Sequence, residues 1–188
     1  MITIGYSTKK ENPNFTEYLK NTCGLKDVQI IEIVNPGLFS LTEAYNKILD
    51  LSINEVVVFT HDDILFEKEY WGKRIIEHFD KKPEYGILGV AGTTYYPSSG
   101  RWWEIQGEMI GQVYHQHQGK KWLSEYNKPF GSKIIDSVIV DGLFFSIKNL
   151  TLKKDLMNLL KVFIFMIQLF VYKTFYQVSK LVPFLMFL

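Results

Sequence analysis

The chain has 188 residues and a formal net charge of +1, with 22% charged and 47% hydrophobic residues. This length fits one domain with one core, and the near-neutral charge gives no indication of nucleic-acid binding or of an acidic substrate. Cys23 is the single cysteine, which excludes a disulfide framework and favours a reducing compartment. The start, MITIGYSTKK, has an apolar strand and not the pattern of a signal peptide, so we expect a cytoplasmic protein.

Strands and helices alternate along the first half of the chain. Apolar runs predict strands at residues 2–6, 28–34, 55–60 and 85–92. Helical spacing predicts helices at 15–24, 40–51 and 67–81. Asn14 is the expected N-cap of the first helix and Gly24 its C-terminal cap, while Ser40 and Glu43 form a capping box for the second. The alternation predicts an α/β fold whose mostly parallel sheet is flanked by helices.

The second half is less regular. Residues 93–122 alternate too loosely to predict strands, whereas KIIDSVIVDGLFFSIK (133–148) predicts one or two strands interrupted at Asp141-Gly142. This pair has two interpretations. It is a turn or β-bulge, which we favour from the pair alone, or it contributes a second acid to a site.

The stretch VVVFTHDDI (Val56–Ile64) ends a fully apolar strand in His61, Asp62 and Asp63. Ligands of open α/β sheets bind at the carboxyl ends of the strands. Adjacent carboxylates there can hold Mg²⁺ or Mn²⁺, with His61 as a further candidate ligand. Successive side chains of an extended segment point to opposite sides, so one acid would bind the metal and the other a group such as a ribose. The alternative is that these acids cap the next helix.

Three further groups of residues are candidates. Glu32 and Asn35 flank the end of the second strand, where they hold a nucleotide base or ribose or else form an ordinary turn. Trp102, Trp103 and Glu104 form a stacking platform with an acid/base, or else core with one exposed acid. His115 and His117 share a face if extended and suit a metal, but a surface strand is the favoured interpretation.

Four stretches in order, IGYST, AYN (Ala44–Asn46), VVVFTHDDI and VDGLFF (Val140–Phe145), resemble bacterial glycosyltransferases of the GT-A fold. The nearest resemblance is to a small family-2-like group that has HDD in place of DxD, and it covers residues 1–155. It implies a UDP- or GDP-sugar donor, Mn²⁺ or Mg²⁺, and a glycan or lipid-linked acceptor.

The resemblance also implies roles for individual residues. Asp63 would bind the metal on the donor diphosphate, with Asp62 near the ribose and His61 as an additional candidate. The expected nucleotide contacts are Ser7, Thr8, Glu32, Asn35, Asn46 and Asp62. The expected sugar and acceptor contacts are Trp102, Trp103, Glu104, Asp141 and Gly142. No catalytic base is assigned.

The tail, residues 156–188, departs from this family. It contains no acid, and no glycine follows Gly142, whereas the family has a base region such as FHFYD after the VDG strand. Lys161, Lys173, Lys180 and Pro183 interrupt the run of ~20 apolar residues that a membrane span needs, which leaves a membrane-surface helix as one interpretation.

A frameshift is the sharper interpretation of the tail. We reverse-translated the tail and read it in a second frame, in which each new codon takes the last base of one codon and the first two bases of the next. In that frame the codons of Met166 and Ile167 (ATG and AT-) must give GAT, which encodes Asp. One permitted second frame contains GFHFYD at residues 161–167. We therefore expect a GT-A domain at 1–155 that is incomplete at its C-terminus. The hypotheses are an active metal-dependent glycosyltransferase, an inactive donor-binding relative, and a membrane-associated binding protein at the inner face of the membrane.

Overall fold

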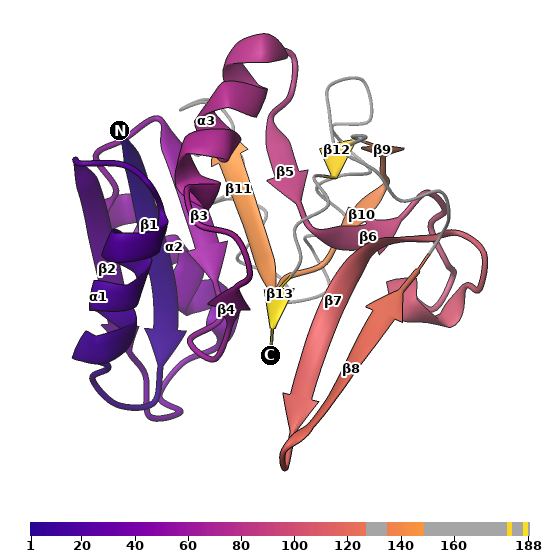
Figure 1. The fold of residues 1–188 in the computed structure, drawn as a ribbon, viewed down its shortest axis with the longest axis horizontal. Helices are drawn as coiled ribbons and strands as arrows, with labels where there is room; N and C mark the ends of the chain where they lie inside the picture. The colour runs from indigo at the N-terminus through magenta and orange to yellow at the C-terminus, as the bar shows by residue number, and fades with distance from the viewer. Residues whose placement is uncertain (127–134, 149–179, 182–185, 188) are drawn as a thin grey trace.

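A computed structural model describes residues 1–126, 135–148, 180–181 and 186–187. Its larger sheet has seven strands in the order β2-β1-β3-β11-β5-β12-β9 (Figure 1). Their bounds are β1 Ile2–Thr8, β2 Val28–Val34, β3 Val56–Thr60, β5 Ile87–Gly89, β9 Ile135–Asp136, β11 Phe144–Lys148 and β12 Lys180–Leu181. All except β11 and β9 run in one direction. The prediction of a mostly parallel sheet is confirmed.

Helices cover both faces of this sheet. Helices α1 (Pro13–Thr22) and α3 (Trp71–Lys81) lie on one face, and α2 (Leu41–Leu51) lies on the other (Figure 1). Strand β3 contacts both layers because successive side chains alternate between faces: Val56 and Val58 belong to one apolar cluster, Val57 and Phe59 to the other. Burial on two faces explains why residues 56–59 of this strand are all apolar.

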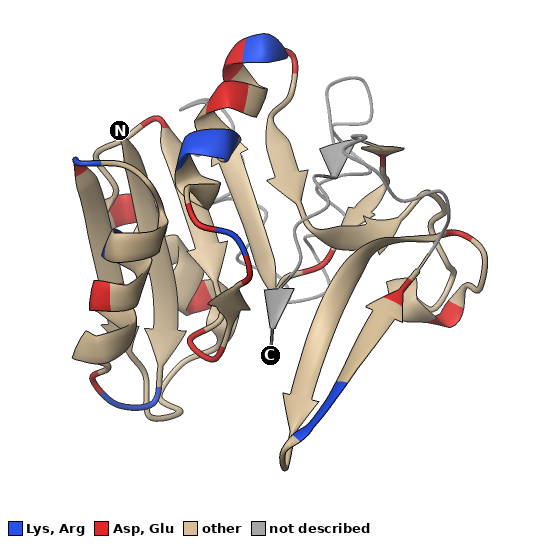
Figure 2. Cartoon of the chain, viewed as in Figure 1, with Lys and Arg blue, Asp and Glu red and all other residues tan. Residues whose placement is uncertain are grey.

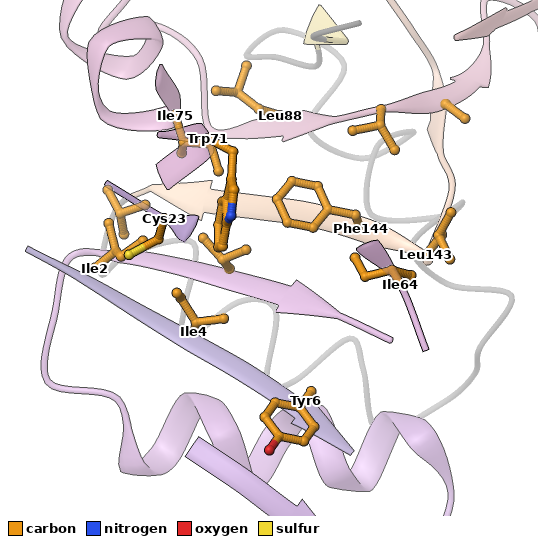
Figure 3. Packing of buried hydrophobic residues seen from close by; sticks show 14 of the residues in the cluster. Ile2, Ile4, Tyr6, Cys23, Ile64, Trp71, Ile75, Leu88, Leu143 and Phe144 are labelled. Atoms are coloured by element: carbon orange, nitrogen blue, oxygen red, sulfur yellow. The ribbon is translucent and has the colours of Figure 1, made fainter. Parts of the chain in front are cut away.

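Trp71 lies at the centre of the first cluster. Its ring is fully buried, stacks on Phe66 at 4.3 Å between centroids, and donates from Nε1 to Thr22 Oγ1 at 3.1 Å. Figure 3 shows it among residues of β1, α3 and β11. Burial of an aromatic side chain of this size contributes about 3 kcal/mol, so α3 is firmly held against the sheet.

The start of α1 differs from the prediction. Asn12, not Asn14, is the N-cap, and its Oδ1 accepts a hydrogen bond from Phe15 N at 3.1 Å. The reason is Pro13, which has no N–H to satisfy and fits the first helical position, so the cap lies one residue before it. At the other end Gly24 follows the helix with a φ of +78°, as its predicted capping role requires.

Two other helix starts test the predictions. The capping box of α2 is confirmed: Glu43 N donates to Ser40 Oγ at 3.2 Å and Ser40 N donates to Glu43 Oε2 at 2.7 Å. Helix α3 begins at Trp71 and not at residue 67, because β4 (Leu65–Phe66) occupies the preceding segment and Tyr70 has a φ of 63°. A left-handed residue cannot continue a helix.

A second sheet has the order β10-β6-β7-β13-β4, with β8 paired to β7. Its strands are β6 Ala91–Thr93, β7 Met109–His117, β8 Lys120–Glu125, β10 Ile139–Val140 and β13 Met186–Phe187, and the 3-10 helix η1 (Trp102–Glu104) precedes β7. The single strand expected at 85–92 is wrong, because the chain bends at Val90 and passes from β5 in one sheet to β6 in the other.

The tail is described only at residues 180–181 and 186–187. The predicted boundary at residue 155 and the FHFYD position of the second frame lie outside the described residues. In the part of the chain that the structure describes, no helix has both the length and the apolar character needed to cross a membrane.

Candidate functional site

The turn after β3 carries His61, Asp62 and Asp63. Buried residues lie on both sides of it: Thr60 ends the strand and Ile64 enters the core (Figure 3). Asp62 is half-buried and Asp63 is exposed. The helix-cap interpretation of these acids is wrong, because the N-cap of the next helix is Tyr70. The turn therefore presents two carboxylates outside the carboxyl end of a buried strand.

Asp141-Gly142 forms a turn between β10 and β11, which belong to different sheets. The backbone is thus the turn that we favoured from the sequence, but the acid also has a defined place. Asp141 Oδ1 accepts a hydrogen bond from Leu143 N at 2.8 Å, and His61 N donates to Leu143 O at 3.1 Å. The backbone of Leu143 therefore links the two acidic turns by hydrogen bonds, at the carboxyl end of β3 in the larger sheet.

Trp102 fixes the second oxygen of Asp141. The indole Nε1 donates to Asp141 Oδ2 at 2.8 Å, and the ring is only 7% exposed. Trp103 is 57% exposed, and its ring meets that of Trp102 edge-on at 6.2 Å. Of the two expected platform residues, Trp103 therefore offers an accessible ring, while Trp102 orients a carboxylate.

Glu104 lies in its own polar cluster on the surface. Its carboxylate accepts hydrogen bonds from Ser99 Oγ at 2.6 Å and from Arg101 Nη1 at 3.0 Å. Ser99 and then Arg101 lower the pKa of Glu104 below its ordinary value. A carboxylate with a lowered pKa is a weaker proton acceptor.

Two buried tyrosines, Tyr6 and Tyr45, have pKa values that burial and the nearby acids raise. Burial raises the pKa of Tyr6 to about 12, and the charges of Glu32 and Asp62 act in the same direction. Burial raises the pKa of Tyr45, and the charges of Asp141 and then Asp62 raise it further. The charge of Asp62 therefore contributes to the raised pKa of both tyrosines. Figure 2 shows these acidic turns in red against mostly uncharged strands.

The candidate nucleotide contacts lie near the carboxyl ends of β1 and β2 and on α2. Ser7 is half-buried, and Thr8 is buried and donates from Oγ1 to Lys10 O at 2.9 Å. Glu32 Oε1 accepts a hydrogen bond from Asn12 N at 2.6 Å. Asn46 projects from α2 and is half-buried, and its buried Oδ1 has no hydrogen-bond partner in the described part of the chain.

Asn35 has the turn role that the sequence left open. Its Oδ1 accepts hydrogen bonds from the backbone N–H groups of Gly37, Leu38 and Phe39 at 3.2, 2.8 and 3.2 Å, and its Nδ2 donates to Phe39 O at 2.6 Å. The side chain thus organises the turn between β2 and α2.

His115 and His117 lie in β7, as the favoured surface-strand interpretation expects. His115 stacks on Trp122 of the facing strand at 5.0 Å and shares a hydrogen bond with Ser124 through Nε2 at 3.0 Å. His117 is exposed and pairs with Lys120.

The two carboxylates of the turn after β3 are of the ligand type that a hard divalent cation prefers, but they would supply only some of its ligands. No cluster of three or more His, Cys, Asp or Glu side chains able to hold a metal exists among the described residues. Mg²⁺ at phosphate-binding sites often takes only one or two carboxylates from the protein, with substrate oxygens and water completing the shell. Asp62 and Asp63 match that limited contribution.

The chain is an α/β protein with a mostly parallel sheet and two acidic turns, one after β3 and one before β11. The profile of the family described as "Glycosyltransferase like family" matches residues 11–179. The chain therefore belongs to the glycosyltransferase-like family, and its sheet flanked by helices agrees with the GT-A fold. The matched residues continue past Asp155 into the tail.

Other comparisons give the fold alone. A search of curated proteins finds no match. Among solved structures, the crystal structure of A197 from STIV is similar with a TM-score of 0.50 and 9% identity, covering 97% of this chain and 81% of that chain.

Proposed function

We propose that this protein transfers a sugar from a nucleotide-diphosphate sugar to a glycan or lipid-linked acceptor, with Mg²⁺ or Mn²⁺ bound at the turn after β3. The observation that carries the proposal is the junction of the two acidic turns through Leu143, whose N and O bond to Asp141 and His61. Membership of the glycosyltransferase-like family supports the reaction class.

Electrostatics favours a metal in this role. A UDP- or GDP-sugar carries a negative diphosphate, which Asp62, Asp63 and Asp141 would repel. A divalent cation on Asp63, with Asp62 or His61 assisting, removes that repulsion. When bound, the metal would supply Lewis-acid stabilisation of the diphosphate leaving group. Donor affinity should therefore depend on the cation.

The remaining roles follow from position. We assign the nucleotide contacts to residues near the ends of β1 and β2 and on α2: Ser7, Thr8, Glu32, Asn35 and Asn46. The side-chain amide of Asn35 is already hydrogen-bonded within its own turn, so we expect the backbone of that turn to contact the nucleotide.

The sugar and acceptor side is assigned to the second acidic turn and η1. Asp141 and Gly142 would line the sugar, with the Asp141 carboxylate held by Trp102 and Leu143. Trp103, 57% exposed, suits stacking against a sugar ring. Glu104 is a poor candidate for the base because Ser99 and Arg101 lower its pKa.

A second candidate is a donor-binding relative without turnover. The observation that favours it is the absence of any acid after Asp155, because transfer to a hydroxyl acceptor needs a carboxylate base. A transfer assay with UDP- and GDP-sugars on this chain and on a frame-restored version separates the two candidates. Activity of the restored version alone supports the second, and equal activity supports the first. Contact of the apolar tail with a membrane is a separate proposal, tested by flotation with liposomes.

A further inference from the structure

Tyr45 is a buried phenol whose hydroxyl has no hydrogen-bond partner among the described residues. Its side chain is 2% exposed, and its ring packs at 4.8 Å from the ring of Phe59 and 6.0 Å from that of Phe145. Within the part of the chain that the structure describes, buried side-chain polar atoms without a partner occur at Tyr45, the adjacent Asn46, and Ser146. A phenylalanine would fill this aromatic pocket equally well, so packing does not account for the hydroxyl.

The neighbours of Tyr45 lead directly to the two acidic turns. Phe59 and Phe145 are partners in the register of β3 and β11, and beyond them His61 N donates to Leu143 O. The chain reaches Asp62 just after Phe59 and leaves Asp141 just before Phe145. The ring of Tyr45 therefore packs on the two strand positions that lead into the acidic turns. The charges of Asp141 and Asp62 act on its hydroxyl.

The Tyr45 hydroxyl carries its proton at neutral pH, as an ordinary phenol does, and can donate one hydrogen bond. The nearby carboxylates are acceptors only. A single group that satisfies both must accept one hydrogen bond and donate another, which a secondary hydroxyl does and a phosphate oxygen does not. Both Asp62 and Asp141 are partly exposed and accessible to such a group.

We propose that Tyr45 is a substrate-reading residue that donates a hydrogen bond to one hydroxyl of the nucleotide sugar, while that hydroxyl donates to Asp62 or Asp141. The assignment rests on the proposed function, and it deepens it by naming the chemistry that this buried donor recognises. The hydroxyl belongs either to the ribose or to the transferred sugar. Asn46, the next residue of α2, also has a buried Oδ1 without a hydrogen-bond partner among the described residues.

The test compares Tyr45→Phe with Ser146→Ala. Both changes remove a buried hydroxyl that has no partner among the described residues. Ser146, however, lies one position beyond Phe145, and its strand partners Val58 and Leu88 belong to the other apolar cluster. Without ligand, both variants should melt at or above the wild-type temperature, because no protein hydrogen bond is lost. With Mn²⁺, Tyr45→Phe should bind UDP-glucose or GDP-mannose about three- to tenfold more weakly, and Ser146→Ala should bind as the wild type does.

Free UDP and GDP distinguish the two sources of the hydroxyl. A loss that already appears with UDP or GDP identifies the ribose, and a loss that appears only with the nucleotide sugars identifies the transferred sugar. Unchanged affinity of Tyr45→Phe for all four probes, while the wild type binds, overturns the role of Tyr45 and leaves the proposed function intact. A lower melting temperature of unliganded Tyr45→Phe also overturns it. Absence of wild-type binding with metal overturns the proposed function and this role together.

Discussion

Substitution of Trp102 by phenylalanine tests how the second acidic turn is held. The change keeps an aromatic ring but removes the Nε1 donor, which lies 2.8 Å from Asp141 Oδ2. A hydrogen bond to a charged group contributes about 1.5–3 kcal/mol, and the lower end applies here because Asp141 is half-buried and water can replace the donor. The smaller ring at a site 7% exposed loses about 1 kcal/mol more.

The sum is roughly 2–3 kcal/mol, which corresponds to a fall in melting temperature of about 5–10 °C for a domain of this size. Trp103→Phe is the matched control, since its ring is 57% exposed, and should cost less than about 0.5 kcal/mol. A double-mutant cycle with Asp141→Ala isolates the hydrogen bond from the packing. Additivity of the two changes to within about 0.5 kcal/mol would refute the reasoning.

Three further predictions concern the frame of the site. Gly5→Ala should destabilise by about 1–3 kcal/mol in denaturant unfolding, because its Cβ would lie 2.2 Å from Ile48 Cγ2 and push α2 away; a loss that Ile48→Ala does not reduce would contradict this. Asn35→Ala should cost about 1–2 kcal/mol in thermal unfolding while Asn35→Asp, which keeps the acceptor, should cost much less; equal losses would count against the turn role. Because the folded-state pKa of Tyr6 is raised to about 12, the stability that this group contributes should be complete below pH 10 and decline between pH 10 and 12; Tyr6→Phe should flatten that decline, and an unchanged slope would exclude it.

The features that the sequence predicts well are those set by local chemistry. A strand buried on both faces is rich in apolar residues, as residues 56–59 are. This run identifies β3 and places His61, Asp62 and Asp63 just after its carboxyl end. The Ser40–Glu43 capping box follows from residue type and spacing. The misplaced cap of α1 belongs to the same class, since Pro13 itself indicates Asn12 as the cap.

The features that the sequence does not predict depend on contacts between distant segments. Trp102 and Asp141 are 39 positions apart, and nothing local to η1 distinguishes an indole that binds a carboxylate from one that stacks on a sugar. The β7–β8 hairpin has polar and half-buried residues on both faces, so its alternation is weak. The sequence predicts Tyr45 as a core residue on the apolar face of α2. The only local indication of a further role is that the residue is tyrosine and not phenylalanine.

The central claim is that a metal at the turn after β3 binds the nucleotide-sugar donor. Calorimetric titration of UDP- and GDP-sugars into the protein, with Mn²⁺ and with chelator, tests it most directly when repeated on Asp63→Ala. Glu67→Ala is the matched control, because Glu67 is an exposed acid beyond β4. We predict binding that requires the cation, falls roughly 10- to 100-fold in Asp63→Ala and is unchanged in Glu67→Ala. Donor binding that persists without metal and is the same in Asp63→Ala would contradict the account.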